Sequence, residues 1–385
     1  MTPSLIPPPL SLYVHLPWCV RKCPYCDFNS HAGKGALPFG DYVDALVRDL
    51  EHDLPLVWGR TVHSVFFGGG TPSLFPPEAI DRILQAASAR LRFAPDAEIT
   101  LEANPGTAEH GRFDGYRAAG VNRVSFGIQS FDDGCLQRLG RIHDSGEAEA
   151  AVKLAQDAGF DNLNLDLMYA LPGQDLAMAE RDLERAFALQ PAHISHYQLT
   201  LEPNTVFFAR PPQGIPDDDA AWDIQERCQA MLAAAGYAHY ETSAYARPGR
   251  QCAHNLNYWR YGDYLGIGAG AHGKITLGAE QSILRRWKHK HPASWMAAAG
   301  GVEAIGGDDR IDPARRPFEY MLNALRLEEG FALSDFESRT GLSRDIIQPA
   351  LDTAREREWL CLSDSRVAPT ALGRRFANDV IGLFL

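Results

Sequence analysis

The stretch "SLYVHLPWCVRKCPYCDF" (residues 11–28) decides how the chain is interpreted, because it joins a β-strand pattern to a cysteine motif. Residues 11–16 form a short β-rich run. Cys19, Cys23 and Cys26 then follow on a C-x3-C-x2-C spacing with no fourth cysteine nearby. A structural zinc site uses four protein ligands, and so does an ordinary electron-carrying iron–sulfur cluster. The motif therefore predicts a metal site that is one protein ligand short.

The same succession of a β-rich run, a turn and a helical segment recurs up to about residue 200. Strands are expected at 11–16, 62–67, 98–103, 123–128, 162–171 and 193–201. Helices are expected between them, at 41–54, 77–91, 147–159 and 176–189. Strands that alternate with helices of this length indicate parallel βαβ units. Six such units in succession predict an α/β fold with a partial parallel (β/α)6 barrel.

Unusual polar motifs fall at or near the C-terminal ends of five of these strands. The cysteine motif follows the first strand and "GGGTP" (68–72) follows the second. "EANP" (102–105) closes the third strand, Gln129 closes the fourth, and Asp166 lies in the fifth. In parallel βα barrels the ligand sites are built on this face. The sequence therefore predicts one site at the C-terminal rim of the barrel.

Alternative interpretations of these motifs remain open from the residues alone. The cysteines could form a zinc knuckle completed by His15 or His31. The three glycines could be a flexible turn, or their missing Cβ atoms could let a ligand approach the backbone. They are not a Walker loop, because no Gly-Lys-Ser/Thr follows. Glu102 and Asp166 need hydrogen-bond donors inside an apolar barrel, and an amino group or ribose hydroxyls would serve.

The segment after the sixth strand carries a less regular pattern. A helix is expected at 217–236, a strand at 237–246 and a polar, aromatic-rich loop at 247–264. "GAGAHG" (268–273) formally fits G-x-G-x-x-G. We reject a dinucleotide fold there, because the strand-like "KITLG" follows where that fingerprint needs a helix.

The character of the chain changes near Pro313. Three helical segments, a β-wing and a last helix predict a mainly helical, winged-helix-like region. The expected division is 1–205 for the barrel, 206–310 for a connecting αβ region and 311–385 for the C-terminal domain. Residues 313–385 carry ten arginines and no lysine against eleven acidic residues, so no basic surface supports DNA binding.

Composition limits the possible functions further. The formal net charge is −12, which opposes non-specific binding to nucleic acid. No apolar run approaches the roughly 20 residues of a membrane span, and the start lacks the pattern of a secretory signal. Seven cysteines, only three of them clustered, do not suggest a disulfide framework. We therefore expect a cytoplasmic protein.

Six motifs together resemble the radical S-adenosylmethionine (SAM) superfamily. They are "YVHLPWCVRKCPYCDF", "FFGGGTPS", "LEANP", "FGIQSF", "LGRIHD" and "NLDLMYALPGQ". The resemblance is closest to the coproporphyrinogen III oxidase-like branch, which contains the anaerobic coproporphyrinogen III dehydrogenase and a family of haem chaperones. It runs from about Tyr13 to the C-terminus.

This resemblance implies two cofactors. Cys19, Cys23 and Cys26 would hold a [4Fe–4S] cluster, and SAM would chelate the fourth iron. The residues that would contact SAM are Tyr13, Tyr25, Gly69, Gly70, Thr71, Glu102, Gln129, Arg141 and Asp166. Arginine can pair with a carboxylate through two hydrogen bonds, and carboxylates accept from ammonium and hydroxyl groups, which suits these positions.

The haem chaperones are the nearer branch. "HNLNYW" (254–259) matches their H-N-x-x-Y-W motif. The dehydrogenases typically carry one more cysteine, at the position of Phe28 here, and a longer arm before Tyr13. The resemblance therefore implies haem as a third ligand, with His254, Tyr258, Trp259 and His272 as its candidate residues. His254 could also be a histidine that merely hydrogen-bonds Asn255 or the backbone.

Three hypotheses follow. The first is a haem chaperone that binds haem, a [4Fe–4S] cluster and SAM and transfers haem to apoproteins such as cytochromes, with a homodimer as a candidate assembly. The second is a radical SAM oxidoreductase of the oxygen-independent coproporphyrinogen III dehydrogenase type, which the residue at position 28 and the short arm before Tyr13 oppose. An electron donor would be needed wherever SAM is cleaved. The third is a zinc-stabilised binding protein.

Overall fold

The structure, a computed structural model, describes residues 3–33, 35–106 and 112–385. Its strands are β1 Leu10–Leu16, β2 Trp18–Cys19, β3 His31–Ala32, β4 Thr61–Gly69, β5 Arg92–Ala103, β6 Arg123–Gln129, β7 Leu163–Tyr169, β8 His193–Gln198, β9 Ala238–Glu241, β10 Ala244–Ala246, β11 Asp263–Ile267, β12 His272–Leu277, β13 Ser282–Lys288, β14 Ile305–Arg310, β15 Phe331–Ala332, β16 Leu360–Leu362 and β17 Arg366–Pro369.

The helices surround these strands. They are α1 Phe39–Asp53, α2 Pro77–Ser88, α3 Phe113–Ala118, α4 Asp133–Arg138, α5 Ser145–Asp157, α6 Leu176–Ala188, α7 Val206–Ala209, α8 Asp218–Ala234, α9 Ala253–Trp259, α10 Pro292–Ala298, α11 Arg316–Ala324, α12 Leu333–Thr340, α13 Gln348–Glu356, α14 Ala371–Arg375 and α15 Ala377–Gly382.

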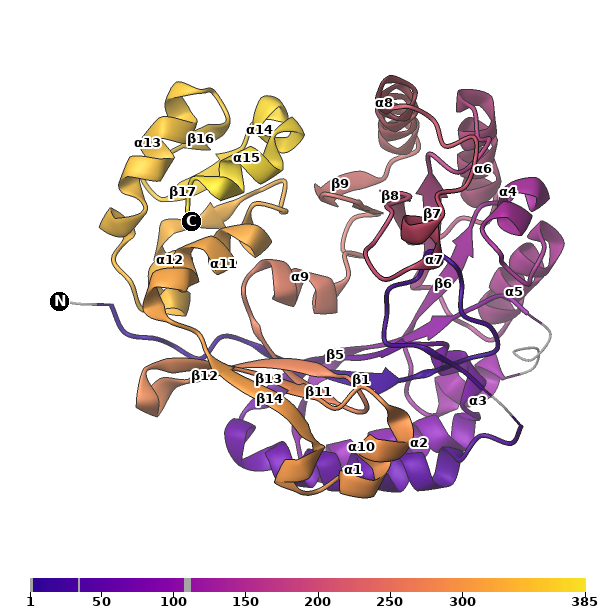
Figure 1. The fold of residues 1–385 in the computed structure, drawn as a ribbon, viewed down its shortest axis with the longest axis horizontal. Helices are drawn as coiled ribbons and strands as arrows, with labels where there is room; N and C mark the ends of the chain where they lie inside the picture. Colours follow the sequence, from indigo (N-terminus) through magenta and orange to yellow (C-terminus); the bar gives the residue numbers. More distant parts are fainter. Residues whose placement is uncertain (1–2, 34, 107–111) are drawn as a thin grey trace.

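The predicted (β/α)6 barrel is confirmed. β1, β4, β5, β6, β7 and β8 are parallel neighbours in that order. Strands such as β1 and β7 are buried on both faces, which explains their continuous apolar runs. Figure 1 shows α1 and α2 below the strands and α4, α5 and α6 to their right, so these helices cover the outside of the barrel. The parallel order brings the carboxyl ends of all six strands to one rim.

The connecting region extends this sheet at both edges. β11 pairs parallel with β1 and is followed by β12, β13 and β14, whereas β10 and β9 continue beyond β8. The described residues thus form one twelve-stranded sheet. The boundary expected at residue 205 falls inside it, and the three-part division stays a prediction.

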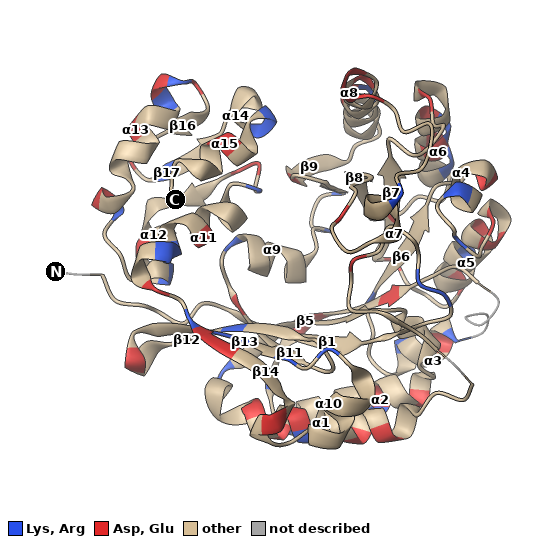
Figure 2. Cartoon of the chain, viewed as in Figure 1, with Lys and Arg blue, Asp and Glu red and all other residues tan. Residues whose placement is uncertain are grey.

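Charged side chains fix the added strands to the barrel. Figure 2 shows basic positions of β13 beside acidic positions of β14. Arg286 on β13 pairs with Asp308 on β14 at 2.7 Å. On the inner side, Lys288 Nζ lies 2.6 Å from both Asp49 Oδ1 and Asp53 Oδ2 of α1, and all three side chains are buried.

Two local expectations in this region are wrong. The segment 237–246 is a hairpin of β9 and β10 rather than one strand. The expected loop 247–264 contains α9, whose first backbone N–H groups donate to Glu98 of β5: Ala253 N to Oε2 at 3.1 Å and His254 N to Oε1 at 3.2 Å. A carboxylate from a distant strand thus accepts hydrogen bonds from the backbone N–H groups at the start of α9. The local sequence therefore does not indicate this helix.

The C-terminal region has its own apolar core, and its winged-helix-like pattern is present. α11, α12 and α13 pack beside a small sheet in the order β15-β17-β16. The last helix is divided into α14 and α15 at Phe376. Leu5 is buried in this same core, and Ile6 N donates to Ser338 O at 2.8 Å. α9 lies between the barrel and the C-terminal region and contacts α11 (Figure 1).

No helix in the described ranges is both long and apolar enough to cross a membrane.

Candidate functional site

A cavity of about 610 Å3 opens at the C-terminal rim of the barrel, and we call it the rim cavity. Eleven of the twelve residues predicted to hold the cluster and SAM line it. They are Cys19, Cys23, Tyr25, Cys26, Gly69, Gly70, Thr71, Glu102, Gln129, Arg141 and Asp166. These residues come from β4, β5, β6, β7 and the loops after β1 and α4. Convergence from such distant positions follows from the parallel strand order.

The three cysteines lie on one loop between β1 and α1. Its ends are held together by the parallel pairing of β2 with β3, and Cys26 N donates to Cys23 O across a turn at 3.2 Å. All three thiols are free, and burial raises the pKa of Cys19 and of Cys26. Burial thus disfavours the thiolate, which is the form that binds metal, at these two positions.

In the part of the chain that the structure describes, the cysteine loop does not form a site for a single metal ion. Within the described ranges, no three His, Cys, Asp or Glu side chains come together around one ion. Both ring nitrogens of His15 are already engaged, Nε2 with Asn29 O at 2.8 Å and Nδ1 with the Tyr13 hydroxyl at 3.1 Å. His31 Nε2 lies 3.2 Å from Asn29 Oδ1. Neither histidine that the sequence offered as a fourth zinc ligand is therefore without a hydrogen-bond partner in the structure.

The glycine run packs against the protein's own chain. Gly69 has φ +116°, and a Cβ there would lie 2.6 Å from His15 Cε1. A Cβ on Gly70 would lie 2.5 Å from the carbonyl oxygen of Trp18. Backbone hydrogen bonds from Gly70 N to Leu16 O and from Thr71 N to Trp18 O, both 2.8 Å, join the two segments. The glycines therefore position the start of the cysteine loop, a role that the sequence did not indicate.

Arg141 links the cysteine loop to the strands. Its Nη1 donates to Cys23 Sγ at 3.6 Å, and its Nη2 donates to Asn104 Oδ1 at 2.7 Å and to Gly127 O at 2.6 Å. Asn104 in turn donates to Thr71 Oγ1 at 2.8 Å. The buried Nε of Arg141 has no hydrogen-bond partner in the described part of the chain. Asn104 was not singled out from the sequence, although it lies inside the "EANP" motif.

Two partly buried carboxyl groups, those of Glu102 and Asp166, line the rim cavity. Burial, reinforced by the nearby Asp166, raises the pKa of Glu102 to about 8. Burial also raises the pKa of Asp166, although its carboxylate accepts hydrogen bonds from Asn164 Nδ2 at 2.8 Å and Ser125 Oγ at 3.3 Å. A cationic or hydroxyl-bearing ligand would stabilise the ionised forms of both groups.

Gln129 is held in an unusual conformation at the end of β6. Its φ is +73°, a left-handed value that non-glycine residues rarely adopt. Its amide oxygen accepts a hydrogen bond from the Tyr197 hydroxyl at 2.8 Å. Tyr197 also lines the rim cavity and was missed from the sequence, because nothing in β8 distinguishes it from a core tyrosine.

Tyr13 does not line the rim cavity. It faces a smaller cavity of about 220 Å3 inside the barrel, which we call the lumen cavity. This cavity shares Glu102, Ser125 and Asp166 with the rim cavity. Tyr13 lies in the middle of β1, so its side chain points into the barrel rather than onto the rim.

The four candidate haem residues do not meet at one point. His254 lies on α9 and lines the lumen cavity, where Nδ1 contacts Ser64 Oγ and Nε2 contacts the Tyr258 hydroxyl, both at 3.0 Å. Burial lowers the pKa of His254 to about 3. Trp259 lines a third cavity between the sheet and α11, and Tyr258 borders both cavities. His272 is exposed at the start of β12, where its ring stacks on Trp287.

Comparisons with known proteins show which families share this architecture. Residues 13–186 match the model of the radical SAM superfamily, and residues 311–376 match that of the HemN C-terminal domain. The chain is 51% identical over 378 residues to the haem chaperone HemW of Escherichia coli and 50% identical over 382 residues to that of Haemophilus influenzae, with 98% of each chain covered. It is 35% identical to HemW of Mycobacterium tuberculosis, covering 98% of this chain and 95% of the relative.

Among solved structures, coproporphyrinogen III oxidase (HemN) of Escherichia coli, a radical SAM enzyme, matches with a TM-score of 0.82 and 25% identity. The match covers 98% of this chain and 90% of the other. The barrel, the cysteine loop at its rim and the C-terminal region are therefore shared along nearly the whole length of these relatives. The chain belongs to the radical SAM superfamily and, within it, to the HemW family.

Proposed function

We propose that this protein is a haem chaperone that binds a [4Fe–4S] cluster, SAM and haem and passes the haem to apoproteins. The observation that carries the proposal is the rim cavity, in which three free thiols, one partly buried arginine and two partly buried carboxyl groups converge. The full-length identity of 51% to a haem chaperone of Escherichia coli supports the haem-carrying part.

Cys19, Cys23 and Cys26 would hold the cluster. A cubane bound by three thiolates has one iron without a protein ligand, and that iron can accept the amino and carboxylate groups of SAM. Anaerobic reconstitution with iron and sulfide tests this assignment. We expect about four irons per chain, and each single Cys→Ser change in the triad should lower this value, whereas Cys361→Ser, at an exposed cysteine away from the cavity, should not. Zinc bound in place of iron would contradict it.

The remaining rim residues would orient SAM. Arg141 can pair with a carboxylate, and Glu102 and Asp166 can accept from ammonium or hydroxyl groups. Gly69, Gly70 and Thr71 lie beside the cysteine loop, where the methionine end would bind, and Tyr25 and Gln129 form further parts of the wall. Tyr13 would contact only a group that reaches the lumen cavity. Anaerobic titration calorimetry with SAM tests these contacts, and an affinity unaffected by Asp166→Asn would contradict them.

Haem would be the cargo. His254, Tyr258, Trp259 and His272 stay predicted haem residues. Titration with ferric haem should give a one-to-one complex, and mixing that complex with an apocytochrome should move the haem absorption to the cytochrome. Failure of both steps would contradict the chaperone function. The recipient apoproteins, an electron donor, a homodimer and a cytoplasmic location also remain predictions.

The second candidate is a radical SAM oxidoreductase, which the similarity to the HemN structure favours. One feature of the chain opposes it. Phe28 stands where the dehydrogenases typically have a further cysteine, and its side chain lines the rim cavity and is 60% exposed. Conversion of coproporphyrinogen III to protoporphyrinogen IX by the reduced, SAM-loaded protein would favour this candidate over the chaperone.

A further inference from the structure

A chain of hydrogen bonds runs through β1 and β4 to the ring of His254 on α9. His254 Nδ1 lies 3.0 Å from Ser64 Oγ, and Ser64 Oγ lies 2.7 Å from Ser11 Oγ. Ser11 Oγ in turn lies 2.9 Å from Asn257 Nδ2. We call Asn257, Ser11 and Ser64 the relay. His254, Ser64 and Ser11 are each only 1% exposed, so their hydrogen bonds have to be satisfied within the protein.

The direction of these hydrogen bonds is set at Asn257. Its Nδ2 also lies 2.8 Å from the backbone carbonyl oxygen of Asp263, an atom that can only accept. The side-chain atom beside Ser11 is therefore the amide nitrogen, which donates to Ser11 Oγ. The Ser11 hydroxyl must place its own proton elsewhere, and among the described residues Ser64 Oγ is the acceptor within reach. With Ser11 donating to Ser64, the proton of Ser64 is directed to His254 Nδ1.

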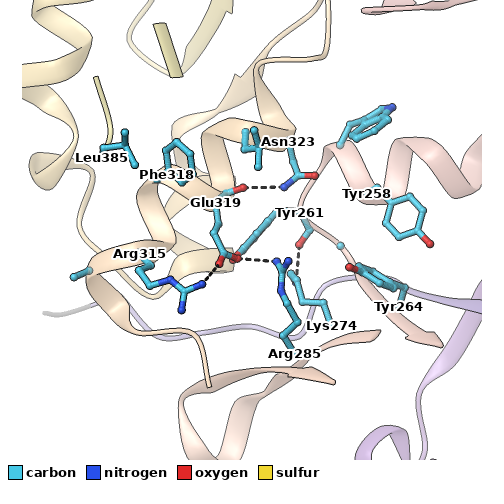
Figure 3. Close-up of a pocket in the computed structure, with 14 residues that line it drawn as sticks. Tyr258, Tyr261, Tyr264, Lys274, Arg285, Arg315, Phe318, Glu319, Asn323 and Leu385 are labelled. Carbon is cyan, nitrogen blue, oxygen red and sulfur yellow. Dashed lines mark hydrogen bonds and ion pairs between the residues drawn. The ribbon is translucent and has the colours of Figure 1, made fainter. Parts of the chain in front are cut away.

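The opposite direction would leave a buried proton unpaired. If His254 Nδ1 donated to Ser64 and Ser64 donated to Ser11, the Ser11 proton would have no acceptor in the described part of the chain. In the direction given above, the unpaired proton is that of Tyr258, whose hydroxyl lies 3.0 Å from His254 Nε2. Tyr258 is only half-buried and lines the lumen cavity, and Figure 3 shows its hydroxyl directed away from the third cavity. Water in the lumen cavity can accept that proton, so the first direction costs less.

The direction of the relay decides where the His254 ring carries its proton. The ring is neutral, because it is buried and the hydrogen-bond partners of both its nitrogens are hydroxyl groups. A neutral imidazole carries a single proton, and the hydrogen bond at one nitrogen decides which nitrogen holds it. Since Ser64 donates to Nδ1, the lone pair is on Nδ1 and the proton is on Nε2, where the Tyr258 hydroxyl accepts it.

We propose that Asn257, Ser11 and Ser64 are positioning residues that fix one tautomer of His254, with its proton on Nε2. The consequence for the cargo rests on the proposed haem-carrying function. A bond from haem to His254 needs a nitrogen lone pair, and Ser64 already uses that of Nδ1. Capture through Nε2 therefore requires the relay to reverse. Nε2 then releases its proton to water, Nδ1 takes up one from water and donates to Ser64, and no electron is transferred.

Nitrogen-15 NMR of the haem-free full chain, labelled at its histidine side chains, tests the tautomer. His254→Gln identifies the His254 signals by their loss. The wild type should show a protonated Nε2 and a non-protonated Nδ1, and the reverse pattern would overturn the proposal. This measurement needs neither haem nor activity.

Variants of Ser64 test the relay itself. Ser64→Ala removes the donor to Nδ1, so the ring should become a mixture of both tautomers and the two nitrogen shifts should move towards each other. Ser64→Thr keeps the hydroxyl and should restore the wild-type pattern. Ser130→Ala is the matched control at a buried serine that bonds to Asp182 instead. An unchanged His254 spectrum in Ser64→Ala would overturn the positioning role, and circular dichroism should verify that each variant is folded.

Zinc protoporphyrin IX, a diamagnetic analogue of haem, separates this inference from the proposed function. Binding through Nε2 should convert the His254 signals to those of a ring protonated at Nδ1. A bound analogue that leaves Nε2 protonated would overturn the reversal of the relay. Failure of the wild type to bind the analogue or haem would overturn the proposed function, whereas the tautomer of the ligand-free protein would still stand.

Discussion

The Nη1 atom of Arg141 lies 3.6 Å from the Sγ atom of Cys23, although 118 positions separate the two residues in the chain. The guanidinium thus donates a hydrogen bond to one of the three thiols that would bind iron. The same side chain is held by Asn104 and Gly127, so its position is set by β5 and β6 and does not depend on the cysteine loop.

Replacing Arg141 should therefore weaken SAM binding more than cluster assembly. Hydrogen bonds to charged groups contribute about 1.5–3 kcal/mol, so Arg141→Gln should lower SAM affinity about ten- to a hundredfold. Anaerobic calorimetry measures the affinity, and iron content measures the cluster. Arg138→Gln is the matched control, because Arg138 lies three residues earlier but bonds to Pro172 O and Cys135 instead. Equal affinities for the Arg141 and Arg138 variants would contradict the role of Arg141.

Glu102 should make the ligand-free protein less stable as the pH rises. Its folded-state pKa of about 8 exceeds the ordinary value of 4.5, so between these limits the folded state binds more protons than the unfolded state. The stability that protonated Glu102 contributes to the folded state is fully present below about pH 4.5 and is lost as the pH rises to about 8. Glu102→Gln removes this loss and should gain on the order of 3 kcal/mol over wild type at pH 8.5. Thermal melts without ligand from pH 5 to 9 measure the difference, and parallel curves would contradict it.

The glycine run should be intolerant of a single methyl group. Gly70→Ala would place Cβ against the Trp18 carbonyl next to Cys19, and such overpacking costs about 1–3 kcal/mol. We expect a lower melting temperature and reduced iron content after reconstitution. Gly40→Ala is the control, because a Cβ there meets no atom within 4 Å and its backbone is helical. Normal iron loading in the Gly70 variant would show that the loop adjusts without this contact.

The buried ion cluster between β13 and α1 should be essential for stability. Lys288→Met would leave Asp49 and Asp53 buried with less charge compensation, which typically costs about 3–5 kcal/mol. Urea unfolding measures the loss. The exposed pair of Arg82 with Asp44, each 52% exposed, is the comparison, and Arg82→Ala should change stability by less than about 1 kcal/mol. Similar losses in the two variants would show that burial does not matter here.

The barrel and its rim could be predicted from the sequence because both depend on periodic, local signals. β1 and β7 are buried runs, and parallel order places Cys19, Glu102 and Asp166 at one rim wherever the strands start. Tyr13 lies apart from the other predicted SAM residues, because its position in the middle of β1 places it in the lumen cavity.

Features that depend on distant contacts could not be predicted. The start of α9 is capped by the carboxylate of Glu98, which lies 155 positions before Ala253. Local helix propensity therefore predicts a loop at this segment. The sheet continues through β11 only because that strand pairs with β1 across most of the chain.

The ring of Tyr258 lines both the lumen cavity and the third cavity, between the sheet and α11. A smaller side chain at this one position would therefore enlarge both spaces at once, so the two cannot be reshaped independently there.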